Sequence, residues 1–255
     1  MLRRGFFKKS VWLSMGALLG ANRLSDERIF KFKNSFNESD WDTLRSQFEI
    51  CQRKAYFNSA TIGPSPEIVM QSVFNKMRAI NEKGSYRGSE KAREALANFF
   101  SVKVEEICLT HNATESINII SQGLALKKGD EVIISDQEHV GHALPWLNRA
   151  EQIGIKLKVF KTAKTSKDNL NRILSLITKR TKVISIPHVN CTTGTRMPIE
   201  LIGNELIDKE IFFLVDGAQA VGNIELNLDA LPCDFYAASC HKWLLGPKGT
   251  GFLYI

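Results

Sequence analysis

From residue 107 onward, short apolar runs alternate with amphipathic segments, and this alternation limits the fold more than any other feature of the chain. The apolar runs are 107–110, 131–135, 155–160, 182–186, 211–215, 235–239 and 251–255, with helical patterns over 113–126, 142–153, 167–177 and 199–209. Continuous apolar strands separated by amphipathic helices are typical of parallel sheets that are covered on both faces. We therefore predict an α/β fold of three layers, with a mostly parallel sheet and helices on both faces.

The residues before this region read as helices, over 39–48, 64–83 and 88–100. A chain of 255 residues is long enough for one large domain with a sizeable core. We predict a large domain over 61–255, preceded by an N-terminal segment over 26–60. Ser166 is the expected N-cap of the helix over 167–177.

The first 25 residues have the pattern of a targeting signal and are not expected to be part of the fold. The pattern Arg3-Arg4-x-Phe6-Phe7-Lys8, followed by a weakly apolar stretch over 11–21, resembles the twin-arginine export motif. A basic tail that happens to hold two arginines, or an uncleaved membrane anchor, is the alternative. We predict a twin-arginine-type signal over 1–25, export by the twin-arginine machinery and a periplasmic protein, which is membrane-tethered if the signal is not cleaved.

Charge and cysteine content exclude several classes of protein. The formal net charge is +7, and four of these charges come from Arg3, Arg4, Lys8 and Lys9, which leaves +3 (7 − 4) for the rest of the chain. We therefore predict no nucleic-acid partner. The five cysteines form no C-x-x-C pair, so we expect buried thiols and neither a disulfide framework nor a metal site.

Polar side chains follow several of the predicted strands, where parallel sheets gather their functional loops. Thr110-His-Asn-Ala-Thr-Glu-Ser116 opens a helix, and it is either an anion site or an ordinary capping box. His139, Asn190, Asp216 with Gln219, and Ser239-Cys-His241-Lys242 follow four further strands. Each of these alone is typical of a surface turn. No Walker motif and no G-x-G-x-x-G after a strand is present, which argues against nucleotide-binding folds.

In this order, these segments resemble the class V aminotransferase family of pyridoxal 5'-phosphate (PLP) enzymes, of fold type I. The resemblance covers residues 55–255 and is closest to the isopenicillin-N epimerase-like branch, with the cysteine desulfurases as more distant relatives. The strings that carry it are Tyr56-Phe-Asn-Ser-Ala60, Thr110–Ser116, His188-Val-Asn190, Val215–Gly222 and His241–Gly251. The last of these is the most specific.

The resemblance implies a role for each of these residues. Lys242 would form the Schiff base with PLP, and Ala113, Thr114, Ser239 and His241 would bind its phosphate. Asp216 would pair with the pyridine nitrogen, Gln219 would lie near the phenolic oxygen, His139 would stack on the ring, and Asn190 would face the ring and the substrate. A carboxylate beside the pyridine nitrogen keeps a proton there and strengthens the electron sink.

The resemblance also implies a longer protein, because family members continue beyond the lysine into a small C-terminal domain. We therefore expect a chain that lacks this small domain, and a homodimer when full length. The expected function is PLP-dependent chemistry on an amino acid or amine, with epimerase, transaminase and lyase reactions left open. The alternatives are a cysteine desulfurase- or selenocysteine lyase-like enzyme, or a non-catalytic remnant that binds PLP weakly or not at all.

Overall fold

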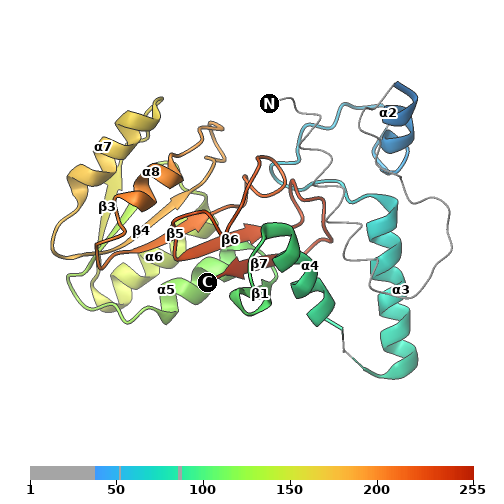
Figure 1. Cartoon of the computed structure of the whole chain (residues 1–255), viewed down its shortest axis with the longest axis horizontal. Coiled ribbons are helices and arrows are strands. Elements are labelled where there is room, and N and C mark those ends of the chain that lie inside the picture. Colours follow the sequence, from blue (N-terminus) through green and yellow to red (C-terminus); the bar gives the residue numbers. More distant parts are fainter. Residues whose placement is uncertain (1–37, 52, 86–87) are drawn as a thin grey trace.

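The computed structural model describes residues 38–51, 53–85 and 88–255, so the predicted signal over 1–25 lies outside the described residues. A seven-stranded sheet forms the centre of the molecule, with strand order β1-β7-β6-β5-β4-β2-β3. Only β7 runs antiparallel to its neighbours β1 and β6. Figure 1 shows the sheet with its helices, and α2 and α3 at the far end of the molecule. The predicted mostly parallel α/β fold is confirmed.

The strands and helices of the described chain have the following bounds. The strands are β1 (Ile107–Thr110), β2 (Glu131–Ser135), β3 (Lys156–Phe160), β4 (Thr181–Pro187), β5 (Phe212–Asp216), β6 (Phe235–Ser239) and β7 (Gly251–Tyr254). The helices are α2 (Glu38–Arg45), α3 (Glu67–Lys83), α4 (Glu90–Phe100), the 3₁₀ turn η1 (Val104–Glu106), α5 (Ala113–Gly123), α6 (Val140–Ile153), α7 (Ser166–Leu176) and α8 (Ile199–Asn204).

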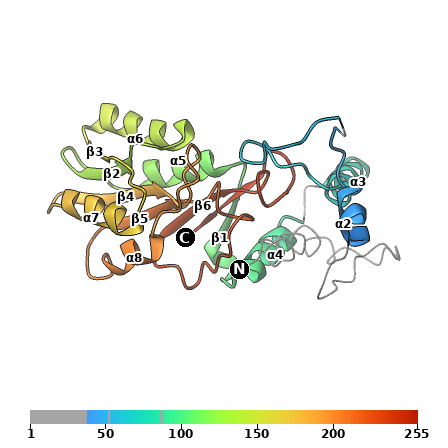
Figure 2. The same cartoon turned by 90° about the horizontal axis from the view of Figure 1, so that it is seen from above.

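Two apolar clusters, one on each face of the sheet, hold the layers together. Helices α5 and α6 cover one face, where Ile117, Trp146 and Leu214 are at most 1% exposed. Helices α4, α7 and α8 cover the other face, where Phe100 and Ile173 are equally buried. Figure 2 shows the two helix layers on opposite sides of the strands. Strands buried on both faces explain why β2 and β4 read as almost continuous apolar runs.

Several helix and strand boundaries differ from the predicted ones for reasons of local chemistry. Thr165, and not Ser166, caps α7, because its side chain accepts the N–H of Asp168. Helix α6 begins at Val140, two residues early, because the ring of His139 caps it. Strand β4 includes Pro187 as its last residue. The helices predicted over 113–126 and 199–209 are shorter, as α5 ends at Gly123 and α8 at Asn204.

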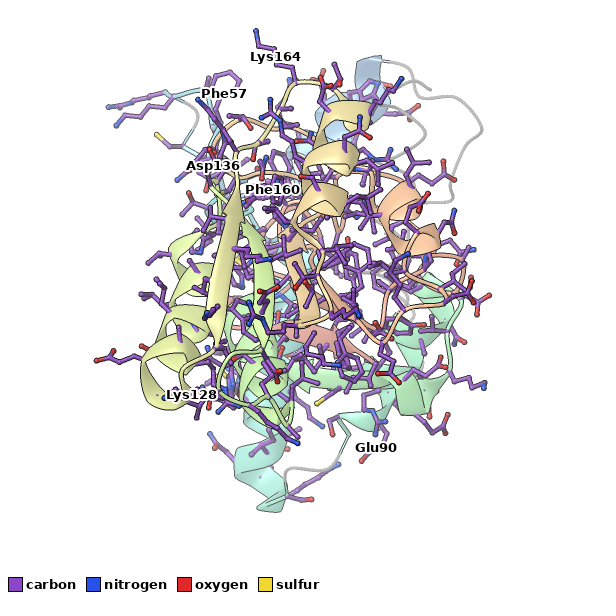
Figure 3. The ribbon with its side chains drawn as sticks, turned by 90° about the vertical axis from the view of Figure 1, so that its left-hand side faces the viewer. Phe57, Glu90, Lys128, Asp136, Phe160 and Lys164 are labelled. Atoms are coloured by element: carbon purple, nitrogen blue, oxygen red, sulfur yellow. The ribbon has the colours of Figure 1, made fainter. Side chains whose placement is uncertain are left out.

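Helix α3 buries little of its apolar surface. Of its residues, only Val69 is buried, while Val73, Phe74 and Met77 are 39%, 49% and 59% exposed. At the opposite end of the molecule, Phe160 closes the edge strand β3 at 3% exposure, and Lys164 extends from the loop that follows (Figure 3). Among the described helices, none combines the length and the apolar character that crossing a membrane requires.

A buried carboxylate anchors the start of β2 and makes stability depend on pH. The Glu131 side chain is 2% exposed and lies 2.9 Å from Lys158 Nζ and 3.4 Å from Arg180 Nε. Burial alone would raise the pKa of Glu131. The hydrogen bonds from Thr178 and Lys158, together with the positive charge of Lys158, outweigh burial and lower this pKa to about 2.

Glu131→Gln is expected to lower the free energy of unfolding at neutral pH by roughly 1.5–3 kcal/mol, the range for hydrogen bonds to a charged group. A depressed pKa gives stability that is complete above the ordinary value of 4.5 and is lost as the pH falls toward 2. The difference in the free energy of unfolding between wild type and variant, measured by urea unfolding, should therefore become smaller below pH 4.5. A difference in the free energy of unfolding that stays constant down to pH 3, about midway between 4.5 and 2, would show that Glu131 does not have this lowered pKa.

Candidate active site

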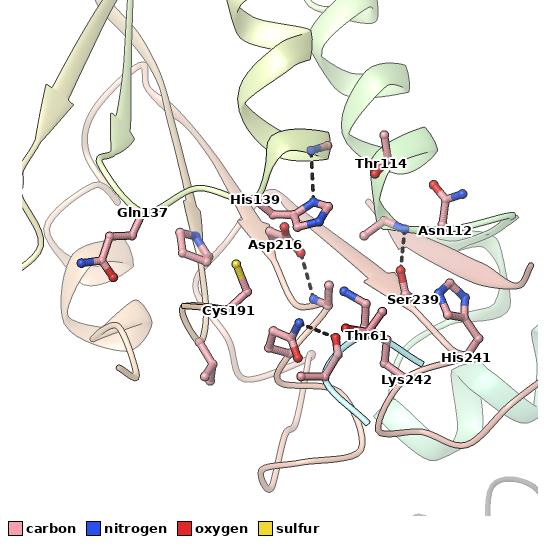
Figure 4. Close-up of a pocket in the computed structure, with 17 residues that line it drawn as sticks. Thr61, Asn112, Thr114, Gln137, His139, Cys191, Asp216, Ser239, His241 and Lys242 are labelled. Carbon is pink, nitrogen blue, oxygen red and sulfur yellow. Dashed lines mark hydrogen bonds between the residues drawn. The ribbon is translucent and has the colours of Figure 1, made fainter. Parts of the chain in front are cut away.

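A cavity of about 480 Å³ opens at the edge of the sheet where β4, β5 and β6 end. It is lined by Ala60, Thr61, Asn112, Ala113, Thr114, Gln137, His139, Gly141, Pro187, Val189, Cys191, Asp216, Ala218, Gln219, Ser239, His241 and Lys242. Figure 4 shows these side chains converging from several loops. The cavity lies where open α/β sheets bind their ligands.

The N-terminus of α5 forms one end of the cavity. Asn112 caps the helix by accepting the N–H of Glu115 at 2.9 Å. The N–H of Ala113 donates to Ser239 Oγ at 3.0 Å, which joins the helix to the end of β6. Thr114 lies beside them on the wall (Figure 4). Backbone N–H groups and hydroxyls at a helix N-terminus favour an anion such as phosphate.

Helix α6 begins close to this end of the cavity. Its cap, His139, accepts the N–H of Gly141 with Nδ1 at 3.0 Å, which fixes the imidazole against the cavity. A Cβ on Gly141 would overlap the hydroxyl of Thr114. Glycine therefore allows the starts of α5 and α6 to approach each other, and a side chain there would fill the space beside Thr114.

Asp216 lies at the end of β5 on the floor of the cavity. Its side chain is 8% exposed, and its Oδ1 accepts the N–H of Ala218 at 2.9 Å. His139 and Asp216 are neighbours in the site, with Ser239 and Lys242 on the far side (Figure 4). The cavity thus carries an anion-binding end and an acidic floor that favours a cation or a protonated ring nitrogen.

Lys242 starts a tight loop between β6 and β7. Cys240 N–H donates to Thr250 O at 2.9 Å, and Gly246 N–H donates to Cys240 O at 2.8 Å. Leu245, three residues after Lys242, has a φ of 63°, which is uncommon for a residue with a branched side chain. Backbone conformations of this kind cost of order 1–3 kcal/mol and occur where the surroundings hold a functional segment in place.

A segment far away in the sequence closes the site. We call residues 58–65 the strap. Gly63 N–H donates to His241 O at 2.8 Å, and Ala60 O accepts the amide of Gln219 at 2.8 Å. Ser65 donates to Gly246 O at 2.9 Å. The strap therefore places Ala60 and Thr61 against the cavity beside Lys242.

The structure brings together eight of the nine predicted site residues. Ala113, Thr114, His139, Asp216, Gln219, Ser239, His241 and Lys242 line the cavity. Asn190 does not line it: the residue is 1% exposed, and its amide atoms have no hydrogen-bond partner among the described residues. Gln219 lines the cavity as expected, and its amide is held in place because it donates to Ala60 O at 2.8 Å and accepts Trp243 Nε1–H at 2.7 Å.

Sequence reasoning did not place Thr61, Gln137, Gly141 or Cys191 in the wall. Thr61 comes from the strap, for which no local pattern exists. Gln137 and Gly141 flank His139 in the chain, so proximity to a predicted site residue was the available signal. Burial raises the pKa of the Cys191 thiol, and the charge of Asp216 adds to the effect, so the group is held in its less nucleophilic form.

The donor set fits PLP. The phosphate matches the N-terminus of α5 with Ser239 and Thr114, the pyridine nitrogen matches Asp216, and a lysine amine is present to bind the aldehyde. An α/β large domain with these groups at the strand ends is of the PLP-binding fold type I class. Residues 69–255 match the family model described as Aminotransferase class-V, and the chain belongs to that family.

Curated relatives include both groups that the sequence suggested. A "Probable cysteine desulfurase" of Methanothermobacter thermautotrophicus is 32% identical over 223 residues, covering 84% of this chain and 56% of the relative. An "Isopenicillin N epimerase" of Amycolatopsis lactamdurans is 29% identical over 226 residues, covering 84% and 57%. The chain thus spans about half the length of the curated relatives that it matches.

Solved structures confirm the fold. A lysine mutant of C-DES, with glycine covalently linked to its PLP cofactor, matches with a TM-score of 0.76 at 29% identity, covering 83% of this chain and 59% of that one. The cysteine desulfurase CsdA from Escherichia coli matches with a TM-score of 0.75 at 28% identity, covering 87% and 58%.

Proposed function

We propose that the protein is a PLP-dependent enzyme that acts on an amino acid or amine, with the cofactor bound covalently to Lys242. The observation that carries this proposal is the convergence of Lys242, Asp216 and the Ala113–Ser239 pair on one cavity. When bound, PLP accepts the electron pair that remains at the substrate Cα after a bond to it breaks.

The residues of this chain have separate tasks around that centre. Ser239, Thr114 and the N-terminus of α5 bind the phosphate and fix the position of the cofactor. Asp216 would hold a proton at the pyridine nitrogen, and His139 would lie against one face of the ring. The Lys242 amine would bind the aldehyde of the cofactor, and as a free amine beside the substrate it would accept or return the proton at Cα.

These tasks are shared by epimerases, transaminases and lyases, so they define the class of chemistry and not the product. Cleavage of a C–S bond in cysteine or a related amino acid is the second candidate, supported by the desulfurase relatives and by the likeness to C-DES.

We further propose that the full-length protein works as a homodimer, which sedimentation of the purified protein tests.

The decisive experiment is to purify the protein, reduce it with borohydride and map the modified peptide by mass spectrometry. A phosphopyridoxyl group on Lys242, together with loss of the visible absorption band, is the expected result. The protein is then incubated with a panel of amino acids in D₂O, and exchange at Cα, racemisation, keto-acid formation and sulfide release are measured. Absence of both the band and the modification would overturn the proposal in favour of a non-catalytic remnant.

We also propose that the protein is exported by the twin-arginine pathway. The support is the Arg3-Arg4-x-Phe6-Phe7-Lys8 pattern, and export after folding suits a protein that must first acquire its cofactor. In a bacterium with this pathway, changing Arg3 and Arg4 together to lysine should retain a C-terminally tagged protein in the cytosol. The variant keeps the charge of the segment, so an unchanged periplasmic yield on fractionation would contradict export by this route.

A further inference from the structure

A fully buried histidine that the proposed function leaves unused lies next to Asp216. His142 is in α6, three residues after His139, and its side chain is 0% exposed. Its Nδ1 lies 2.6 Å from Glu138 Oε2 and 3.6 Å from Asp216 Oδ2, and these two carboxylates are 2% and 8% exposed. One imidazole therefore stands between two buried acids, of which only Asp216 lines the cavity.

The other side of the ring is held equally firmly. His142 Nε2 lies 2.6 Å from Ser185 Oγ on β4, and the same oxygen accepts Trp146 Nε1–H at 2.9 Å. Both Trp146 and Ser185 are 0% exposed. The ring thus links α6, β4 and β5 beneath the cavity, and it cannot turn without breaking contacts at both nitrogens.

The surroundings favour the protonated form of His142. Burial by itself lowers the pKa of His142, but the charge of Glu138, followed by that of Asp216, outweighs burial and raises the pKa above its ordinary value. Glu138 uses its other oxygen, Oε1, to accept the N–H of Ser135 at 2.9 Å and its hydroxyl at 2.6 Å. Ser185 and Trp146 bring no charge to the site. The charged groups that face the ring are therefore two acids.

We propose that His142 is a positioning residue for Asp216, and that its imidazolium balances the Glu138 and Asp216 carboxylates and holds Asp216 toward the cavity. The proposal rests on the proposed function, because the partner of Asp216 in the cavity is the ring nitrogen of PLP. Two ionised carboxylates that face the same buried ring repel each other, and a cation between them offsets this repulsion. His142 thus fixes the place of Asp216 at the floor of the cavity.

The charge of His142 can be measured without reference to the cofactor. The ring nitrogens of the histidines are observed by ¹⁵N NMR in the purified protein, and His142 is assigned by the signals lost in His142→Asn. Both nitrogens are expected to be protonated at pH 7.5, where a histidine of ordinary pKa 6.5 is about nine-tenths neutral. Glu138→Gln should lower the pH at which this proton is lost. A neutral ring at pH 7.5 would overturn the proposal.

A set of three variants separates charge balance from packing. His142→Asn is expected to raise the PLP dissociation constant at pH 7.5 by about tenfold, a coupling typical of side chains in one network. Adding Glu138→Gln should restore most of this loss, because a single carboxylate then needs no cation beside it. If the two substitutions weaken PLP binding independently, so that their effects add in the double variant, the role of His142 is structural and the proposal fails.

Thermal unfolding of each variant shows whether it is folded. If His142→Asn does not fold, the His142 signals are assigned instead as the histidine signals that shift most in Glu138→Gln, because Glu138 Oε2 lies 2.6 Å from His142 Nδ1. The outcomes also separate the two proposals. A wild type without a modified Lys242 sinks the proposed function, whereas a neutral His142 in a protein that carries PLP on Lys242 sinks only the positioning role.

Discussion

Replacing Lys242 with alanine is expected to abolish covalent attachment of PLP and to reduce turnover at least about 10³-fold, since a positioned acid–base group alone contributes 10²–10⁴. Among the described residues that line the cavity, Lys242 is the only lysine, and the variant removes the amine that can both bind the aldehyde and move the Cα proton. Borohydride should then leave the protein unmodified, while PLP still binds through Ser239 and the N-terminus of α5. The rate is measured as Cα-proton exchange with the best amino acid of the panel.

Lys164→Ala is the matched control, because Lys164 is an exposed lysine in the loop after β3 and extends away from the body (Figure 3). Its absorption band and its exchange rate should equal those of the wild type. A Lys242→Ala protein that keeps the borohydride-fixed group, on whichever lysine, would show that Lys242 is not the attachment point.

Gly63→Ala is expected to destabilise the protein and to damage the site at the same time. A Cβ at this position would overlap the carbonyl oxygen of Lys242 and lie 3.0 Å from Leu245 Cδ2. Overpacking of this kind costs about 1–3 kcal/mol, which lowers Tm by roughly 2–4 °C per kcal/mol in a chain of this size. The strap or the Lys242 loop must move, and a displacement near 1 Å reduces turnover by about 10²-fold.

Gly123→Ala provides the control for the loss of a glycine. Gly123 ends α5, and a Cβ there would meet no atom within 4 Å. Its Tm should be unchanged or slightly higher, because alanine favours helix over glycine. Scanning calorimetry and borohydride labelling of both variants make the comparison. A Gly63→Ala protein with wild-type Tm and full labelling of Lys242 would show that the strap does not press on the lysine.

The alternation of apolar runs predicted the sheet, the resemblance to the class V family implied most of the residues that line the cavity, and the sheet explains why they meet. Parallel strands bring their carboxyl ends to the same edge, so the polar residues that follow each apolar run had to meet there. Asp216 and Ser239 are the clearest cases, since each is the last residue of a strand and faces the cavity.

Side-chain direction was harder to predict than position. Asn190 follows a strand as expected, but it begins a tight turn in which its own N–H donates to Thr195 O and its carbonyl accepts Gly194 N–H, both at 2.9 Å. Its buried amide is not part of the cavity wall, although its neighbours Val189 and Cys191 are. The N-cap of α7 was also predicted one residue too late. Thr165 and Ser166 are adjacent and have the same capping chemistry, so the sequence does not distinguish them.

The contacts of the strap could not be predicted from its local sequence, because they depend on residues far along the chain. Ser65 and Gly246 are 181 positions apart, and Ala60 and Gln219 are 159 apart. No periodicity within residues 58–65 encodes these partners. The Glu138–His142 pair did carry a signal, an acid and a histidine four residues apart at a helix start, but its relation to Asp216 required the fold.

The order of the strands in the sheet also determines when the pocket can form during synthesis. Strand β1 leads into the end of the cavity at α5, yet its only neighbour among the described strands is β7, the last of them. Contacts between such distant segments are closed late and slowly in folding. The end of the site at α5 therefore cannot be completed until β6 and β7 have been made, and PLP should bind only after these strands have joined the sheet.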